Sequence, residues 1–131
     1  MSATEPYGHV FVYGTLRRGG ANDINRLKPA TRFKGFAQVA GRLFSLGDYP
    51  GIQLGPSGWV VGEVYTLSPE LESVLDEIEG ITPVSDGQYQ KVSVEVWVGS
   101  QNLNCLIYAA TIGALARGTY MVSGDWMTRG A

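Results

Sequence analysis

The sequence predicts an α+β fold: a small, mostly antiparallel mixed β-barrel with one main helix and short flanking helices. Three observations support this prediction. About four to six segments have the composition of strands, and a single segment has the period of an amphipathic helix. In addition, 18 of the 131 residues are glycine, roughly twice the usual share. So many glycines favour a fold with many turns, and the excess of strands favours a closed or nearly closed sheet.

The first strand is predicted over residues 9–13. Its last four residues are apolar and either β-branched or aromatic, which suits a strand that is buried on both faces. Gly14 then ends the strand, because a residue without a Cβ allows a sharp turn and a close approach to the backbone. The short polar stretch 19–27 is expected to form a helical turn over the strand end, with Asn22 as its cap.

Further strand candidates follow in the middle of the chain. The segment 33–46 resembles a long strand that bends at Gly35 and Gly41. Residues 47–51 have the chemistry of a turn. Two more strand candidates follow this turn. The first is a short strand at 52–54, and the second is a strand at 59–67, with a loop at 55–58 between them.

Residues 68–79 carry the clearest helix signal. Ser68 is a good N-cap, Pro69 suits the first helical position, and Gly80 supplies the C-terminal stop. Apolar residues recur at the spacing of one buried stripe; they are Leu71, Val74, Leu75 and Ile78. A loop is expected over residues 81–88.

The last clear pattern is a hairpin. Residues 89–98 alternate, with four valines on one face, and residues 103–110 return antiparallel after a turn at 99–102. Beyond residue 113 the signals are weak, although the segment 124–126 is expected to pack back on the body of the protein.

Composition excludes several function classes. The chain length fits one domain, which we assign to residues 9–131 behind a loose lead-in of residues 1–8. Ten basic and twelve acidic residues give a net charge of -2, which offers no support for binding nucleic acid or an anionic membrane.

One cysteine cannot form an internal disulfide, so a cytoplasmic location is the default expectation. No signal peptide or membrane-spanning run is expected, and no oligomeric state is indicated.

Glu79 is the side chain that breaks the helical pattern. At 100° per residue it lies roughly 40° beyond Leu75, at the edge of the apolar stripe, whereas Asp76 and Glu77 are expected to be solvated. Partial burial and the negative end of the helix dipole both predict a raised pKa for Glu79, which suits an acid that accepts and returns a proton. The alternative is a boundary glutamate paired with Arg42 or Lys91.

The turn after the first strand is the second candidate feature. The main-chain amides of Thr15, Leu16 and Arg17 leave the sheet there and can form a small anion-binding nest. The alternative is an ordinary glycine turn after a core strand. A phosphate loop is rejected, because Gly20 and Ala21 stand where that motif requires lysine and a hydroxyl residue.

Other candidates carry weaker signals. Tyr89 and Tyr108 could donate hydroxyl hydrogen bonds into a pocket, or else pack in the sheet with a wet tip. Glu63 is interpreted as a cross-strand partner. His9 and Cys105 are not assigned chemistry, because no cluster has metal-ligand spacing and a single histidine supports no Ser-His-acid set.

Several short blocks occur together in one order. They are Val12-Tyr13-Gly14-Thr15-Leu16-Arg17, Asp48-Tyr49-Pro50-Gly51, Val61-Gly62-Glu63-Val64-Tyr65, Leu75-Asp76-Glu77-Ile78-Glu79-Gly80 and Tyr89-Gln90-Lys91. In this order the chain resembles the gamma-glutamylcyclotransferase-like family over most of residues 10–110. The resemblance implies a small barrel with flanking helices, and an amide-cleaving, cyclising acyltransferase or lyase that releases 5-oxoproline without cofactor or metal.

The resemblance also implies roles for individual residues. Glu79 matches the catalytic glutamate, and Tyr89 matches a tyrosine that commonly follows it. The substrate loop would be Tyr13, Gly14, Thr15 and Leu16, whose amides hold the gamma-glutamyl part. The substrate would be a small gamma-glutamyl peptide or amine whose leaving group is open: an amino acid, a polyamine, a lysine-linked amine or an antibiotic precursor. The alternative function is a non-catalytic module that keeps the pocket for a small acid or a partner.

Overall fold

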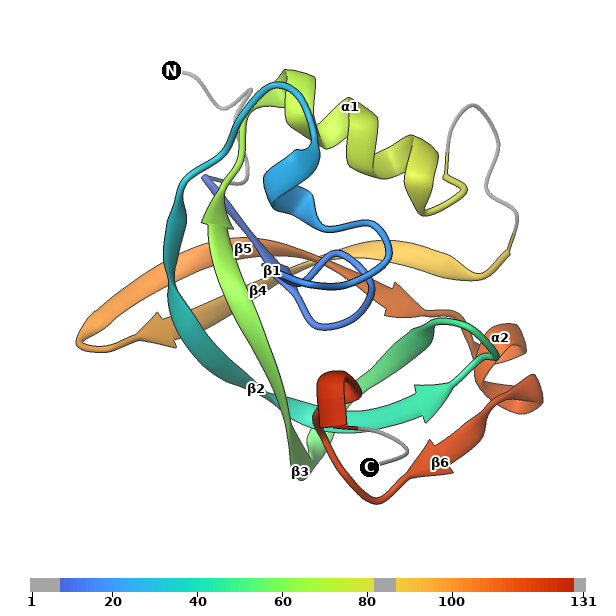
Figure 1. The fold of residues 1–131 in the computed structure, drawn as a ribbon. Coiled ribbons are helices and arrows are strands. Elements are labelled where there is room, and N and C mark those ends of the chain that lie inside the picture. Colours follow the sequence, from blue (N-terminus) through green and yellow to red (C-terminus); the bar gives the residue numbers. More distant parts are fainter. Residues whose placement is uncertain (1–7, 82–86, 129–131) are drawn as a thin grey trace.

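A computed structural model describes residues 8–81 and 87–128. Six strands form one curled sheet, a half-barrel, with two short helices and two 3-10 turns (Figure 1). The strands are β1 (His9–Val12), β2 (Phe33–Ser45), β3 (Pro50–Thr66), β4 (Tyr89–Val98), β5 (Gln101–Ala110) and β6 (Thr119–Met121). The remaining elements are α1 (Pro69–Ile78), α2 (Ile112–Arg117), η1 (Ile24–Arg26) and η2 (Trp126–Thr128). The predicted α+β class is confirmed.

The sheet is mixed because of its central strand. The strand order is β4-β5-β1-β3-β2-β6, and β1 runs antiparallel to β3 but parallel to β5. All other pairings are antiparallel except a single parallel bridge between Ile52 and Ala109. The short β1 therefore lies between two long hairpins, β4-β5 and β2-β3.

Two hydrophobic clusters meet at β1. Phe11 and Tyr13 belong to the cluster inside the curl, whereas Val10 and Val12 belong to the cluster beneath α1. Figure 1 shows α1 lying across the face of the sheet that contains β1, β4 and β5. The prediction that the first strand is buried on both faces is confirmed, and its alternating side chains hold the two layers together.

The helix and the bends follow the sequence signals closely. The Ser68 side chain accepts a hydrogen bond from the Leu71 amide, and Gly80 has a φ of +73° just past the helix end. The pairing of β2 with β3 shifts register next to Gly35 and again next to Gly41, at the two predicted bend positions. The buried Trp126 confirms that the tail packs back.

Some expectations for the strands and the tail were wrong. The segments predicted as strands 52–54 and 59–67 are one strand, β3, in which residues 55–58 form an insertion where β2 pairs directly from Trp59 to Leu54. The glycine and proline residues at 55–58 suggested a loop between two strands, but the continuous β2 pairs with the residues on both sides of this segment. The tail also holds α2 and β6, which had no clear pattern because each is short.

Two polar residues also differ from expectation. Asp23, not Asn22, caps the turn η1, because its side chain accepts a hydrogen bond from the Asn25 amide. Asp76 is buried rather than solvated, because Tyr108 and Lys91, on the strands beneath α1, supply it with hydrogen bonds. The predicted lead-in and the 81–88 loop lie mostly outside the described residues.

Candidate active site

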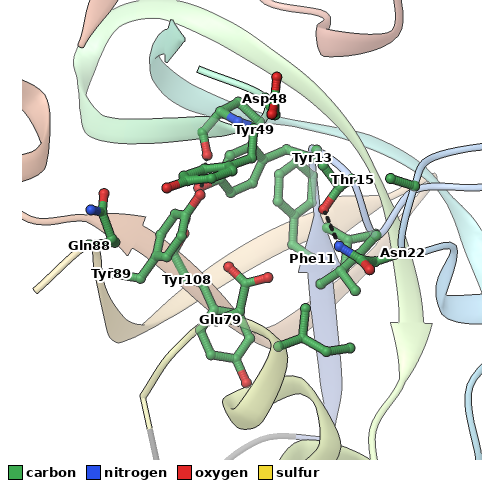
Figure 2. A pocket seen from close by; sticks show the side chains of 16 residues that line it. Phe11, Tyr13, Thr15, Asn22, Asp48, Tyr49, Glu79, Gln88, Tyr89 and Tyr108 are labelled. Carbon is green, nitrogen blue, oxygen red and sulfur yellow. Dashed lines mark hydrogen bonds between the residues drawn. The ribbon is translucent and has the colours of Figure 1, made fainter. Parts of the chain in front are cut away.

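A cavity of about 280 Å³ lies where β1 ends, between the turn after it, the start of β3 and the end of α1. The residues predicted as catalytic or substrate-binding all line it. They are Tyr13, Gly14, Thr15, Leu16, Glu79, Tyr89 and Tyr108. Figure 2 shows Asp48, Tyr49 and Gln88 on the same cavity, together with Asn22. Helix, loop and sheet segments far apart in the sequence therefore share one opening.

The start of β3 is held tightly against the end of β1. A Cβ on Gly14 would lie 2.5 Å from Cγ of Pro50, so only glycine permits this approach. The Tyr13 hydroxyl accepts a hydrogen bond from the Ile52 amide at 3.1 Å and donates to the Tyr108 carbonyl at 2.6 Å. The Tyr89 hydroxyl donates to the Pro50 carbonyl. These bonds fix the floor of the cavity.

Glu79 enters the cavity from the C-terminal end of α1. It is the helix C-cap, its amide donates to the Leu75 carbonyl at 2.9 Å, and it is half-buried. Figure 2 shows its carboxylate directed into the pocket. Burial raises the pKa of the Tyr13 hydroxyl, and the Glu79 charge raises it further. For Tyr108, burial and the bond to Asp76 raise the pKa first, and the Glu79 charge adds to them.

The bases that sequence reasoning offered as partners of Glu79 make other contacts. Lys91 forms ion pairs with Glu72 and Asp76 on α1, and Arg42 lies over the ring of Tyr120 at 6.0 Å. Lys91 thus links β4 to α1. Glu79, the C-cap of α1, lines the cavity.

The tyrosines contribute rings rather than open hydroxyl donors. Tyr108 donates its hydroxyl hydrogen to Asp76 at 2.6 Å, and Tyr13 and Tyr89 donate to main-chain carbonyls. With Phe11 and Tyr49 these rings give the cavity aromatic walls. Tyr89 and Tyr108 line the cavity, but both hydroxyl groups donate within the protein, so the expectation that they donate hydrogen bonds into the pocket is not met in this structure.

The loop after β1 supplies hydrogen-bond donors. Among residues 8–81 and 87–128, the amides of Thr15 and Leu16 have no acceptor, whereas the amide of Arg17 donates to the Gly14 carbonyl. The side chain of Asn22 donates to the Thr15 hydroxyl at 3.2 Å, across the cavity rim (Figure 2). Of the three amides predicted to form an anion-binding nest, those of Thr15 and Leu16 remain available beside the cavity and that of Arg17 does not, and anion binding there stays a prediction.

A buried ion network holds this loop in place. Arg17 donates from Nε to Glu63 at 2.9 Å and from Nη1 to Asp125 at 2.7 Å, and the amide of Arg18 also donates to Glu63. Arg17 and Glu63 are both buried. Glu63 is therefore a partner of the loop, not of a neighbouring strand, and Asp125 brings the tail to the site. The role of the Arg17 side chain was not predicted, because its partners Glu63 and Asp125 lie 46 and 108 residues away in the chain.

The described part of the chain contains no candidate metal site and no candidate membrane-spanning helix. No group of three or more His, Cys, Asp or Glu side chains among residues 8–81 and 87–128 is arranged to hold a metal ion. No helix within those ranges has the length and apolar character needed to cross a membrane. Burial raises the pKa of the Cys105 thiol to about 12, so it is a neutral core residue.

A family profile described as gamma-glutamyl cyclotransferase, AIG2-like, matches residues 10–128. The chain belongs to this family. It is 27% identical over 117 residues to a gamma-glutamylaminecyclotransferase of Rattus norvegicus, covering 77% of this chain and 76% of that protein. It is 42% identical over 72 residues to the gamma-L-glutamyl-butirosin B gamma-glutamyl cyclotransferase of Niallia circulans. That match spans 54% of this chain and less than half, 45%, of the Niallia protein.

The fold agrees with the family assignment. The crystal structure of an AIG2-like protein from Mus musculus superposes with a TM-score of 0.71 at 25% sequence identity. The match covers 91% of this chain and 88% of the mouse protein. The half-barrel of this cyclotransferase-family member is thus the family's fold.

Proposed function

We propose that this protein is a gamma-glutamyl cyclotransferase that releases 5-oxoproline from a small gamma-glutamyl compound, with Glu79 as general acid and base. One observation carries the proposal. The Glu79 carboxylate borders the same cavity of about 280 Å³ as the amides of Thr15 and Leu16, which have no acceptor within the described residues. A single compact molecule can contact both. Membership of the family supports the reaction class.

The substrate brings its own nucleophile. The α-amine of the gamma-glutamyl group attacks the γ-carbonyl carbon, which forms the C–N bond of a five-membered lactam and breaks the C–N bond to the leaving amine. No water is consumed. The protein's main task is therefore to hold the substrate bent, and holding reacting groups together supplies a large part of such accelerations.

Glu79 carries the protons. As a carboxylate it accepts a proton from the α-ammonium group, which makes the amine nucleophilic, and it returns a proton to the leaving nitrogen. In total, two protons pass from the α-nitrogen to the leaving group, which departs as an ammonium ion. The amides of Thr15 and Leu16 hold the α-carboxylate or stabilise the oxygen on which negative charge develops.

The test replaces the carboxylate and keeps its shape. Glu79→Gln cannot accept a proton, so 5-oxoproline release from a panel of gamma-glutamyl peptides and amines should fall by about 100-fold or more in kcat. Glu77→Gln is the matched control, because Glu77 is an exposed neighbour on the same helix. Full activity in Glu79→Gln would refute the assigned base. Binding of the whole panel by the wild type without turnover would favour the non-catalytic module.

A further inference from the structure

The hydrogen bonds of the loop after β1 set the directions of the Thr15 and Leu16 amides. The Gly14 carbonyl accepts a hydrogen bond from the Arg17 amide at 3.0 Å. The Thr15 carbonyl accepts one from the Asn22 amide at 2.9 Å. Both peptide units are trans, so each N–H group points away from the carbonyl of its own unit. The direction of the Thr15 amide therefore depends on where Arg17 is held.

The guanidinium group of Arg17 lies between two carboxylates that differ in burial. The Glu63 side chain is 4% exposed, and it also accepts a hydrogen bond from the Arg18 amide. The Asp125 side chain is 27% exposed, and its Oδ1 accepts from the Met127 amide at 3.0 Å as well as from Arg17 at 2.7 Å. Glu63 is thus the buried member of the network, and Asp125 is the outer member that can be replaced at a smaller cost in stability.

The tail is seated by contacts that do not involve the Asp125 side chain. On one side of Asp125, the Gly124 carbonyl accepts a hydrogen bond from the Val61 amide at 2.8 Å. A Cβ on Gly124 would lie 1.9 Å from the Trp59 carbonyl oxygen, so the two segments are in close contact. On the other side, Trp126 is buried in the hydrophobic cluster inside the curl. Both neighbours of Asp125 therefore hold the tail in place, and its carboxylate is directed at Arg17.

We infer that Asp125 is a positioning residue, which acts through Arg17 to fix the amides that hold the gamma-glutamyl part of the substrate. The inference rests on the proposed cyclotransferase function. Asp125 is not among the residues that line the cavity, so it does not touch the substrate. Its bond to Arg17 holds the loop before the substrate arrives, so the amides need no reordering during the reaction. The tail, 108 residues from Arg17 in the chain, is thereby part of the site.

Two substitutions at Asp125 test this role by 5-oxoproline release. Asp125→Ala removes the acceptor of the Arg17 bond, and kcat/KM should fall about ten-fold. The factor should be the same for every gamma-glutamyl compound that the wild type converts, because the amides contact the part that these compounds share. Asp125→Asn keeps an oxygen that can accept from Arg17, so it should recover most of the lost activity.

Two controls separate positioning from a loss of structure. The Val61 amide reports whether the tail is seated, because it donates to the Gly124 carbonyl, so its hydrogen exchange should stay slow in Asp125→Ala. Val96→Ala truncates a core residue that does not line the cavity. It should lower the melting temperature and leave kcat/KM unchanged when both are compared well below that temperature.

Three results would overturn the inference. The first is an unchanged kcat/KM in Asp125→Ala. The second is fast exchange of the Val61 amide in that variant, which would mean that Asp125 acts by seating the tail. The third is an equal loss of kcat/KM in Val96→Ala, which would mean that activity follows stability alone.

Failure of this inference can be told apart from failure of the proposed function. If the wild type releases 5-oxoproline and Asp125→Ala is as active, the cyclotransferase proposal holds and the positioning role fails. If the wild type converts no gamma-glutamyl compound, the cyclotransferase proposal fails. Calorimetry with the gamma-glutamyl amide of butylamine then decides whether Asp125 positions the amides. Weaker binding to Asp125→Ala than to the wild type supports that role, and equal binding, or binding to neither protein, contradicts it.

Discussion

The two ends of the cavity are built in opposite ways. At the end next to β1, the loop that presents the amides of Thr15 and Leu16 is held by the buried pair Arg17 and Glu63. At the other end, Asp48 is exposed and has no partner in the described part of the chain. The first end is held in place by a buried ion pair, and the second is an exposed turn.

This difference matches the chemistry that we propose. The gamma-glutamyl group is constant among the candidate substrates, and closing its ring demands accurate positioning, so a rigid end suits it. The leaving group varies in size and charge among these substrates. The cavity has to accommodate it but does not have to position it accurately. A permissive end lets one fold serve different leaving groups, because substitutions at an exposed turn cost little stability.

The largest expected effect is at the rigid end. Glu63→Gln removes the charge opposite the buried Arg17, and breaking a buried ion pair from one side costs about 3–5 kcal/mol. Urea unfolding should show a loss of that size, and kcat/KM should fall for every gamma-glutamyl compound. The control is Glu95→Gln on the exposed face of β4, which should change the unfolding free energy by less than about 0.5 kcal/mol. Similar small losses in both variants would mean that the network does not hold the loop.

The contact between the end of β1 and the start of β3 comes next. In Gly14→Ala the new methyl group would lie 2.5 Å from Cγ of Pro50, so the two segments must separate. Overpacking of this kind costs about 1–3 kcal/mol, and the widened cavity should lower kcat/KM. Gly55→Ala is the matched control, because nothing lies within 4 Å of its added Cβ. An unchanged melting temperature and activity in Gly14→Ala would show that the contact is not needed.

Alkaline pH probes the floor of the cavity. Burial raises the pKa values of Tyr13 and Tyr108 above their ordinary value of 10. Above about pH 10 the unfolded chain loses these protons while the folded protein keeps them, so stability falls as pH rises. With an unfolded pKa near 10, each tyrosine should contribute a loss of about 1.4 kcal/mol in total between pH 9 and pH 11. Comparing urea unfolding between pH 9 and 11 in wild type and Tyr108→Phe checks this prediction, because the variant should lose stability less steeply.

The smallest expected effect is at the permissive end. Asp48→Asn removes one carboxylate charge, as Glu63→Gln does, yet it should change the unfolding free energy by less than about 0.5 kcal/mol. Parallel denaturation of the two variants measures the difference directly. A loss of several kcal/mol in Asp48→Asn would show that this turn is also structural, and the contrast between the two ends would disappear.

The sequence predicted those features that depend on local pattern. Capping by Ser68, the apolar stripe of α1, the bends near Gly35 and Gly41 and the alternating valines of β4 all reflect interactions among near neighbours. The inward position of Glu79 followed from the same helical period. Its role as an acid-base group remains a prediction.

Features that depend on distant partners were missed. Asp76 is buried because Tyr108, 32 residues away in the chain, donates a hydrogen bond to it. Arg17 is buried because Glu63 and Asp125 meet it from β3 and the tail. Neither partner is visible in a local window. The short elements α2 and β6 are stabilised by their packing against other segments, which the local sequence pattern does not reveal.

The most direct test is a crystal structure of the protein with 5-oxoproline bound. We predict one molecule in the cavity, with an oxygen atom within hydrogen-bond distance of the amides of Thr15 and Leu16 and its ring nitrogen beside the Glu79 carboxylate. Binding of 5-oxoproline anywhere else on the protein, or in the cavity without contact to Glu79, would contradict it.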